Sequence, residues 1–209
     1  MTDPSSNPSQ EFWEPHYAKM SRPSGGRVSV VLKQFVEARP IGTALELGCA
    51  RGDDAIWLAK QGWRVTGVDV AEAALIAARA SAKKAGVSDR TTFERHDLGA
   101  TFPTGKFDLV TAMFFHSPVD FGRVQALRRA AKSVAKSGLL LVVAHGSRAP
   151  WSWADPDMVY PTAQDELKDL SVNTHEWRQI FVRPIERDAT GPDGQSAVVI
   201  DTVIAIERR

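Results

Sequence analysis

The sequence predicts a single α/β domain whose core is a doubly wound, mostly parallel sheet with helices on both faces. Short apolar runs, such as residues 43–47 and 138–145, have the composition of strands that are buried on both sides. Amphipathic stretches of helical period separate these runs, and this alternation is typical of a parallel sheet. Near the C-terminus, residues 174–187 and 197–207 alternate between apolar and polar side chains, so they predict a hairpin that turns at residues 191–194.

Composition places the chain among ordinary globular proteins. Its 209 residues are enough for one domain with a full core, which we expect over residues 11–209, after a disordered tail at residues 1–10. The net charge of +1 comes without the long basic run that would indicate a nucleic-acid partner. No apolar stretch has transmembrane length, residues 1–10 do not resemble a signal peptide, and the single cysteine fits a reducing compartment. We therefore expect a cytoplasmic protein with no membrane or nucleic-acid partner.

The first part of the predicted sheet combines a strand, a loop of small residues, a helix and a second strand that ends in an acid. Residues 43–47 form the strand, residues 48–52 (Gly-Cys-Ala-Arg-Gly) form the loop, and residues 64–68 lead to Asp69. A loop of small residues lets the backbone approach a ligand closely, and a carboxylate on the neighbouring strand can accept two hydrogen bonds from ribose hydroxyls. The unit therefore predicts a nucleoside-bearing ligand across the carboxyl ends of two parallel strands.

Acidic residues around this loop favour a cationic ligand over a dinucleotide. Glu46 precedes the loop, and Asp53 or Asp54, one of which we expect to cap the next helix, follows it. These carboxylates would repel a pyrophosphate, which otherwise suits a helix N-terminus. The spacing also differs from G-x-G-x-x-G, so a nicotinamide-dependent oxidoreductase is disfavoured.

The pattern Glu46-x-Gly48-x-Ala50-x-Gly52 resembles motif I of the class I S-adenosylmethionine-dependent methyltransferases, which reads E/D-x-G-x-G-x-G. The resemblance implies a Rossmann-like sheet of about seven strands with an antiparallel last strand. It also implies S-adenosyl-L-methionine as the cofactor, S-adenosyl-L-homocysteine as the product, and Asp69 as the ribose acid. The chain departs from the motif at Ala50, whose methyl group narrows the space for the methionine part of the cofactor.

Other positions match cofactor residues of this family. Asp97 and Leu98 follow the third predicted strand, residues 91–95, where the family binds the adenine amino group and a ring nitrogen. Met113 and Phe114 end the fourth strand, at the edge where open parallel sheets bind ligands. The residues expected to bind the cofactor are Trp13, Tyr17, Glu46, Gly48, Cys49, Ala50, Gly52, Asp69, Val70, Asp97, Leu98, Met113 and Phe114.

An aromatic stripe lies near the N-terminus. Its members fall on one face at helical spacing, and they are Phe12, Trp13, His16, Tyr17 and Met20. Such a stripe either packs on the core or covers a site. The spacing of Trp13 and Tyr17 matches the W-x-x-x-Y lid of the small methyltransferases that this chain resembles. We therefore expect residues 11–26 to form a lid, whose aromatic faces also suit a sulfonium cation.

The remaining elements follow from periodicity. Helices are predicted over residues 28–36, 71–85, 121–136 and 165–170, and a fourth strand over residues 106–113. The basic residues of the 121–136 helix are interpreted as a solvated face rather than a binding patch. Asp108 lies near the start of its strand, far from the ligand edge, and is interpreted as structural.

Two histidines are candidates for a general base, because His116 and His145 each follow a strand at the ligand edge. A lone histidine is more often structural, and a thiolate or a heterocyclic nitrogen would need no base. Trp151 and Trp153 either cover the sheet edge or form, with Phe115 and His116, an aromatic wall around a planar acceptor. The sequence has no cluster of metal-ligand spacing, so no metal is expected.

The sequence thus predicts an enzyme that methylates an N, O or S atom of a small aromatic or heterocyclic molecule. The single-domain build with an N-terminal lid resembles the thiopurine and tellurite-resistance methyltransferases and bacterial methyltransferases of heterocyclic toxins, which implies detoxification or secondary metabolism. Two alternatives stay open. The first follows from the departure at Ala50: the chain could be a sensor or assembly protein that binds the cofactor without catalysis. The second is a methyltransferase whose acceptor is a protein or an RNA. A monomer or a homodimer is expected.

Overall fold

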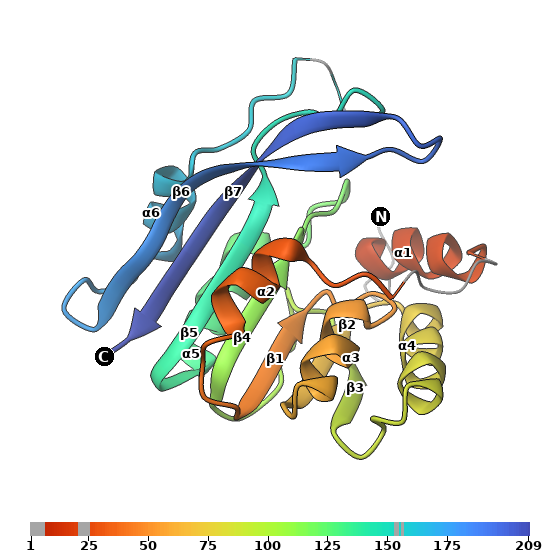
Figure 1. Ribbon diagram of the computed structural model, residues 1–209, viewed down its shortest axis with the longest axis horizontal. Coiled ribbons are helices and arrows are strands. Elements are labelled where there is room, and N and C mark those ends of the chain that lie inside the picture. Colours follow the sequence, from red (N-terminus) through yellow and green to blue (C-terminus); the bar gives the residue numbers. More distant parts are fainter. Residues whose placement is uncertain (1–6, 21–25, 153–154, 156) are drawn as a thin grey trace, which may run out of the picture.

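The computed structural model describes residues 7–20, 26–152, 155 and 157–209. One seven-stranded sheet runs through it in the order β3-β2-β1-β4-β5-β7-β6 (Figure 1). Its strands are β1 (Thr43–Leu47), β2 (Arg64–Asp69), β3 (Thr91–Arg95), β4 (Phe107–Met113), β5 (Val134–His145), β6 (Trp177–Thr190) and β7 (Ser196–Arg208). The helices are α1 (Pro8–Ala18), α2 (Val30–Val36), α3 (Asp53–Lys60), α4 (Glu72–Lys84), α5 (Arg123–Ser133) and α6 (Ala163–Leu170).

The sheet has the predicted mixture of strand directions. Strands β3, β2, β1, β4 and β5 pair in parallel, and β7 pairs antiparallel with β5 on one side and with β6 on the other. The expected doubly wound sheet with an antiparallel last strand is therefore confirmed. The chain reverses its direction of winding between β1 and β4, and ligands bind at the carboxyl edge of such a switch point.

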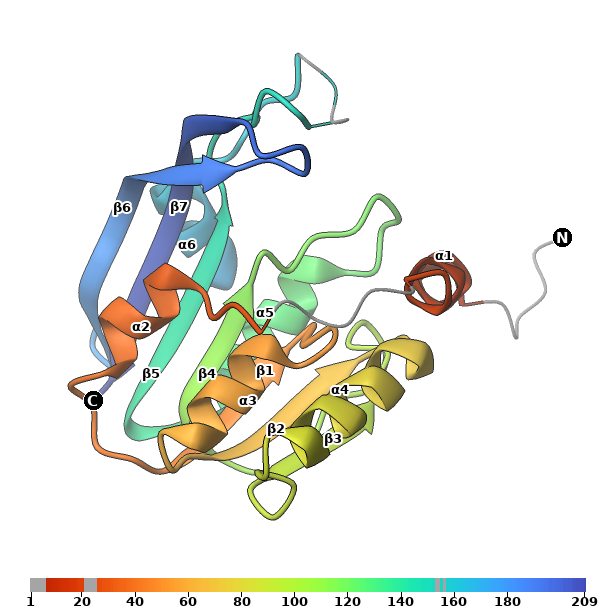
Figure 2. The same cartoon turned by 45° about the vertical axis from the view of Figure 1, so that its right-hand side comes forward.

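Helices cover the two faces of the sheet in separate groups (Figure 2). Side chains of α2, α3 and α4 pack in one hydrophobic cluster, and side chains of α5 and α6 pack in the other. The central strand β5 contributes side chains to both clusters, because Leu139 and Leu141 belong to the first and Leu140 and Val142 to the second. All four are at most 1% exposed, which agrees with a strand buried on both faces.

Three local predictions were wrong. Residues 8–10 belong to α1, not to a disordered tail, because the Asn7 side chain accepts a hydrogen bond from the Gln10 backbone and caps the helix. Helix α5 ends at Ser133, and the predicted continuation to residue 136 is instead strand, because buried Val134 pairs with Phe107. Residues 1–6 lie outside the described residues.

The third error concerns the cap of α3. Gly52 occupies the N-cap position with a left-handed φ of 78°, and it has no side chain to cap the helix. Asp53 and Asp54 are the first two helical residues instead. Their carboxylates accept hydrogen bonds from the backbone of Gly26 (3.1 Å) and Ser29 (2.7 Å), so they hold the segment that leads into α2.

Candidate functional site

A pocket lies at the carboxyl edge of the sheet, beneath α1. Its lining residues come from α1, from the tips of β1, β2 and β3, and from the segment after β4. They are Ser9, Trp13, Tyr17, Gly48, Asp69, Val70, His96, Asp97, Leu98, Phe114, Phe115, His116, Ser117 and Phe121. The pocket thus brings together most of the residues that the sequence assigned to a cofactor. Glu46, Cys49, Ala50, Gly52 and Met113 are not among the lining residues.

The loop after β1 is held in shape by Asp69. One carboxylate oxygen of Asp69 accepts a hydrogen bond from the Ala50 backbone (2.9 Å), and the other accepts one from the Ala71 backbone (3.0 Å). Gly48 and Ala50 both have left-handed φ angles, 63° and 47°. Burial raises the pKa of Asp69, which is only 7% exposed. The backbone of Val70 also contributes a hydrogen bond to this carboxylate, whose two oxygens together offer about four acceptor sites, so one site is left for a ligand hydroxyl.

Ala50 is strained, because a left-handed backbone costs a residue with a Cβ about 1–2 kcal/mol. We expect Ala50→Gly to raise the thermal unfolding midpoint slightly, since the strain removed exceeds the entropic cost of glycine by up to about 1 kcal/mol. Ala55→Gly, inside α3, is the matched control and should lower stability by about 1 kcal/mol or more. Equal destabilisation by both substitutions would contradict the role of strain at Ala50.

Glu46 carries an unusual buried carboxylate. The residue is 4% exposed, and its Oε2 atom has no hydrogen-bond partner among the described residues. Burial, reinforced by the nearby Asp54 carboxylate, raises the pKa of Glu46. A buried carboxyl group without a partner is unfavourable, so this carboxyl group next to the glycine loop fits a ligand that places a cationic or hydrogen-bonding group beside it. Cys49 beside it is buried, and burial raises the pKa of its thiol, so it fits the small-residue interpretation rather than a reactive thiol.

Helix α1 forms one wall of the pocket. The rings of Trp13 and Tyr17 stack on each other at 5.8 Å and both line the cavity. Burial and the neighbouring Asp69 carboxylate raise the pKa of Tyr17, so its hydroxyl stays protonated. Phe12 and Met20, which follows the end of α1, do not line the pocket and are 38% and 41% exposed. The predicted single stripe is therefore split, and only the Trp13 and Tyr17 half faces the site.

Polar contacts fasten α1 over the pocket. The Asn7 side-chain amide donates to Asp97 (3.1 Å) and the Trp13 indole donates to the Ser117 hydroxyl (3.1 Å). The Glu14 carboxylate accepts hydrogen bonds from two backbone amides at the start of α4, at 2.7 and 2.9 Å. A carboxylate at a helix N-terminus is favourable because it meets unpaired amides and the positive end of the helix dipole.

The segment after β4 closes the pocket from the other side. Phe114 has a left-handed φ of 51°, which is uncommon for a bulky residue. The Phe115 ring lies against Gly48, so closely that a Cβ on Gly48 would come within 2.7 Å of it. The Arg123 guanidinium donates to the Phe115 carbonyl (2.8 Å). These contacts place the two phenylalanines between the glycine loop and the start of α5.

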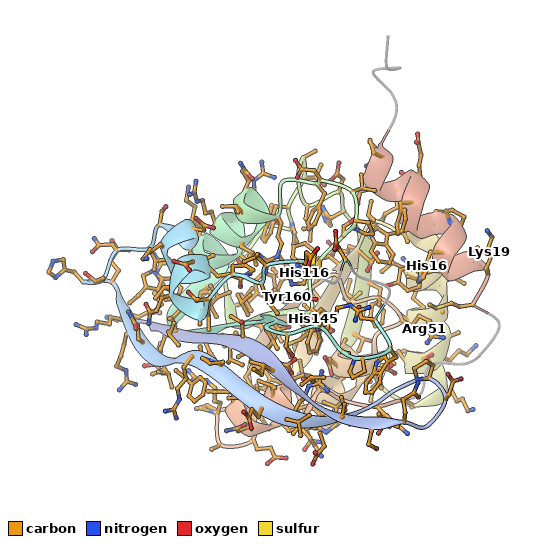
Figure 3. All side chains as sticks on the ribbon, turned by 90° about the horizontal axis from the view of Figure 1, so that it is seen from above. His16, Lys19, Arg51, His116, His145 and Tyr160 are labelled. Carbon is orange, nitrogen blue, oxygen red and sulfur yellow. The ribbon has the colours of Figure 1, made fainter. Side chains whose placement is uncertain are left out.

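The two candidate bases lie next to each other. His116 lines the pocket and lies beside His145 (Figure 3), with 6.1 Å between the two ring centroids. The His145 ring also lies tilted by 30° against the Phe114 ring, at a centroid distance of 4.7 Å. Burial, with smaller contributions from Arg123 and His145, lowers the pKa of His116 to about 4. Burial also lowers the pKa of His145, while Asp201 raises it and Arg187 lowers it. Both imidazoles are therefore neutral near pH 7 and able to accept a proton.

Of the two tryptophans predicted to form an aromatic wall after β5, the structure describes only Trp151. Trp151 packs at the hairpin turn, where a Cβ on Gly191 would lie 2.7 Å from its ring, and it is not among the pocket-lining residues. Trp153 lies outside the described residues. Phe115 and His116 line the pocket as expected.

Sequence reasoning missed several residues of the site. Ser9, His96, Ser117 and Phe121 line the pocket, and two of them stand directly beside predicted candidates, His96 before Asp97 and Ser117 after His116. The solvated-face interpretation of α5 was wrong for Arg123, whose side chain is 19% exposed and forms an ion pair with buried Glu166 (2.9 Å). Nothing in the local pattern of α5 distinguishes this arginine from the other basic residues of the helix.

Among the residues that the structure describes, no group of three or more histidine, cysteine, aspartate and glutamate side chains is placed to hold a metal ion. No helix in the described part of the chain is long and apolar enough to cross a membrane.

Comparison with known proteins identifies relatives of this chain. Residues 44–138 match the family model of a methyltransferase domain. The ubiquinone biosynthesis O-methyltransferase of Hahella chejuensis is 34% identical over 160 residues, which cover 73% of this chain and 63% of that protein. The 2-heptyl-1-hydroxyquinolin-4(1H)-one methyltransferase of Mycobacteroides abscessus is 29% identical over 145 residues, or 67% of this chain and 61% of that protein. The chain thus spans less than two thirds of the length of both curated relatives.

Solved structures share the fold over nearly the whole chain. TehB from Haemophilus influenzae aligns with a TM-score of 0.68 and 14% identity, covering 96% of this chain and 67% of TehB. A chain solved in work on the conversion of a disulfide bond into a thioacetal group during echinomycin biosynthesis aligns with a TM-score of 0.72 and 20% identity, covering 95% and 92% of the two chains. At these identities the likeness establishes a shared fold, and it does not identify the acceptor.

Proposed function

The chain carries a class I S-adenosylmethionine-dependent methyltransferase domain, and we propose on this premise that it methylates a small planar aromatic or heterocyclic molecule. The observation that supports this most is the pocket at the switch point, which combines acids, an aromatic lid and a neutral histidine. The acceptor atom is oxygen, nitrogen or sulfur, and the names of the relatives favour oxygen. Detoxification or secondary metabolism is the role that such an acceptor suggests.

The residues present fit the cofactor of this family, S-adenosyl-L-methionine. Asp69 and Asp97 offer carboxylates to the pocket and would accept hydrogen bonds from a ribose hydroxyl and the adenine amino group. The unpartnered carboxyl oxygen of Glu46 fits a positively charged group, and the rings of Trp13 and Tyr17 suit a sulfonium. When bound, the cofactor supplies an electrophilic methyl group and departs as a neutral thioether.

The chain itself contributes positioning, exclusion of water and proton transfer. Alignment of two reactants in one site can supply about 7–11 kcal/mol of a reaction barrier. Helix α1, through Trp13, and the segment after β4, through Phe114 and Phe115, enclose the reactants from opposite sides. If the acceptor arrives as a hydroxyl, a ring nitrogen of His116 takes the proton that the acceptor oxygen loses. His145, whose ring lies against that of Phe114, is the second candidate for this proton.

A binding and turnover experiment tests this function. We expect S-adenosyl-L-methionine and S-adenosyl-L-homocysteine to bind in calorimetry, and NAD to show no binding. A panel of heterocyclic phenols, N-hydroxyquinolones and thiols is then screened for methylation with the cofactor labelled in its methyl group. Binding of NAD alone would overturn the proposal, and cofactor binding without transfer to any member would favour the non-catalytic alternative.

His116→Gln is expected to lower kcat about 10²–10⁴-fold for a hydroxyl acceptor, because it removes the proton acceptor while preserving the approximate shape of the side chain. His175→Gln, in the exposed segment before β6, is the matched control and should leave kcat unchanged. The neutral form of His116 is present above its lowered pKa of about 4, so kcat/KM should stay high at pH 6 and fall as the pH approaches 4. If the His116→Gln variant has the same kcat as the His175→Gln control, His116 is not the general base.

A further inference from the structure

Four planar groups form a row beside the pocket. The His116 and His145 rings stack at a centroid distance of 6.1 Å, and the His145 ring is tilted by 30° against the Phe114 ring at 4.7 Å. The Arg187 guanidinium carbon lies 5.6 Å from the centroid of the Phe114 ring. Three separate segments supply this row: the residues after β4, the tip of β5, and β6. The row therefore connects the closing hairpin, whose strands β6 and β7 reach past the tip of β5 (Figure 1), to the two candidate bases.

Arg187 is anchored at the far end of this row. Its Nε atom donates to the carboxylate of Asp201 at 2.5 Å, and Asp201 is fully buried at 0% exposure. Asp201 pairs directly with His145 on β5 and with Ile185 on β6. Directly paired residues of antiparallel strands project from the same face, so Asp201 brings Arg187 to the side of the sheet on which His145 lies.

Phe114 is the member of the row that needs support. Its left-handed backbone is an unfavourable conformation, and such conformations persist where the surrounding structure constrains them. The His145 ring and the Arg187 guanidinium both contact the Phe114 ring. A guanidinium over an aromatic face is attracted to the electrons of the ring, so Arg187 helps to keep the Phe114 ring in place.

We propose that Arg187 is a positioning residue of the acceptor site. Anchored on Asp201, its guanidinium holds the Phe114 ring, and Phe114 in turn holds the rings of the two histidines. The proposal rests on the proposed methyl transfer and adds the closing hairpin to the machinery of that reaction. Because the row is a continuous wall of flat groups, loss of Arg187 loosens the surface against which a planar acceptor is aligned.

Arg183 provides a matched control. It lies on β6 four residues before Arg187, hence on the same face of the strand, and its guanidinium carbon is 4.5 Å from the Phe181 ring centroid. Phe181 packs edge-on against Phe35 of α2 and does not line the pocket. Arg183→Met thus removes the same kind of contact from the same strand at a distance from the site.

The first arm of the test is an NMR titration of the histidines without cofactor or acceptor. The charged and titratable groups that face His145 are Asp201 on β7, Arg187 on β6 and His116 after β4. We expect Arg187→Met to raise the pKa of His145 and Asp201→Asn to lower it, because the two charges act in opposite directions. Arg183→Met should change neither this pKa nor the chemical shifts of Phe114.

The second arm measures binding and kinetics. In calorimetry, Arg187→Met should keep its affinity for S-adenosyl-L-methionine within about 2-fold of the unaltered protein. With 2-heptyl-1-hydroxyquinolin-4(1H)-one as the probe acceptor, we expect KM to rise about 10-fold, which by itself corresponds to about 1.4 kcal/mol, and kcat to fall as well. Arg187→Lys keeps the ion pair without the planar stack, and it should reproduce the change in KM without destabilising the fold.

The outcomes separate this proposal from the proposed function. If Arg187→Met and Arg187→Lys behave like Arg183→Met in the titration, in the Phe114 chemical shifts and in KM, Arg187 has no positioning role. If the unaltered protein fails to bind the cofactor, methyl transfer is refuted, while the NMR arm still decides whether Arg187 positions Phe114 and His145. If Arg187→Met unfolds, Arg187→Lys decides the question alone.

Discussion

Asp69→Asn should weaken the binding of S-adenosyl-L-methionine by about 100-fold or more, which corresponds to about 2.7 kcal/mol or more. The substitution removes the charge from the carboxylate that we expect to accept a ribose hydroxyl, and a charge-assisted hydrogen bond contributes about 1.5–3 kcal/mol. It also weakens the bonds by which Asp69 holds the backbone of Ala50 and Ala71. Calorimetry on the folded variant, with thermal unfolding as a check, measures the loss.

Asp108→Asn is the matched control for this experiment. Asp108 is also an acid on a central strand, and its carboxylate binds the Thr43 backbone (2.8 Å) and hydroxyl (2.9 Å), far from the ligand edge. This geometry agrees with the structural role predicted from the sequence. Asp108→Asn should lower stability and leave cofactor affinity unchanged. Equal affinity losses in both variants would mean that Asp69 acts through the fold alone.

The affinity for the cofactor should also depend on pH. Burial raises the pKa of Asp69, so this carboxyl group becomes protonated at a higher pH than an exposed aspartate does. The ionised form that accepts a ribose hydroxyl is present above the raised pKa and is lost as the pH falls through it. Cofactor affinity in the unaltered protein should therefore decline on acidification, and the decline should be absent in Asp69→Asn.

Glu166→Leu should destabilise the protein by about 3 kcal/mol or somewhat more, because it leaves the largely buried guanidinium of Arg123, 19% exposed, without its counter-charge. For a chain of this size, the melting temperature would fall by about 6–12 °C. The same change frees Arg123, which holds the Phe115 carbonyl, so the pocket wall should loosen as well. Differential scanning calorimetry gives the shift directly.

The double variant Arg123→Met with Glu166→Leu separates the effect of the unpaired charge from the effect of lost packing. Replacement of both members of a buried ion pair by apolar side chains is often neutral or stabilising, so the double variant should recover most of the lost stability. Lys168→Met, which breaks an exposed ion pair with Asp165 on the same helix, should leave the melting temperature nearly unchanged. If the double variant is as unstable as Glu166→Leu, the loss comes from packing and not from the unpaired charge.

Local patterns of the sequence were sufficient for most of the fold. The third strand was predicted with the bounds that the structure has, residues 91–95, and β1 likewise matches residues 43–47. Apolar runs and helical periodicity arise from burial in a two-faced sheet, and that burial acts on each segment separately. The errors lie at element boundaries. Two of them concern the local caps at Asn7 and Gly52, and at the third a non-local contact decides. Val134 continues a helical pattern, yet its pairing with Phe107 makes it the first residue of β5.

The sequence also predicted the part of the candidate site that we expect to bind the cofactor. The glycine loop and the acid at the tip of β2 have fixed spacing, because one strand, one turn and one helix separate them. Gly48, Asp69, Asp97 and Phe114 accordingly line the pocket as the sequence predicted. Trp13 and Tyr17 also line it, although Phe12 and Met20 do not.

The sequence by itself determined the class of the fold, the glycine loop at the carboxyl edge of the sheet and the acids beside it, because these depend on local spacing and burial. Only the tertiary structure decided which charged side chains pair with each other around the proposed acceptor site. Arg187 meets Asp201 through the register of β6 on β7, and Arg123 meets Glu166 through the packing of α5 beside α6. No local periodicity encodes which partner a buried charge finds, since that choice is made when distant segments pack and desolvate each other.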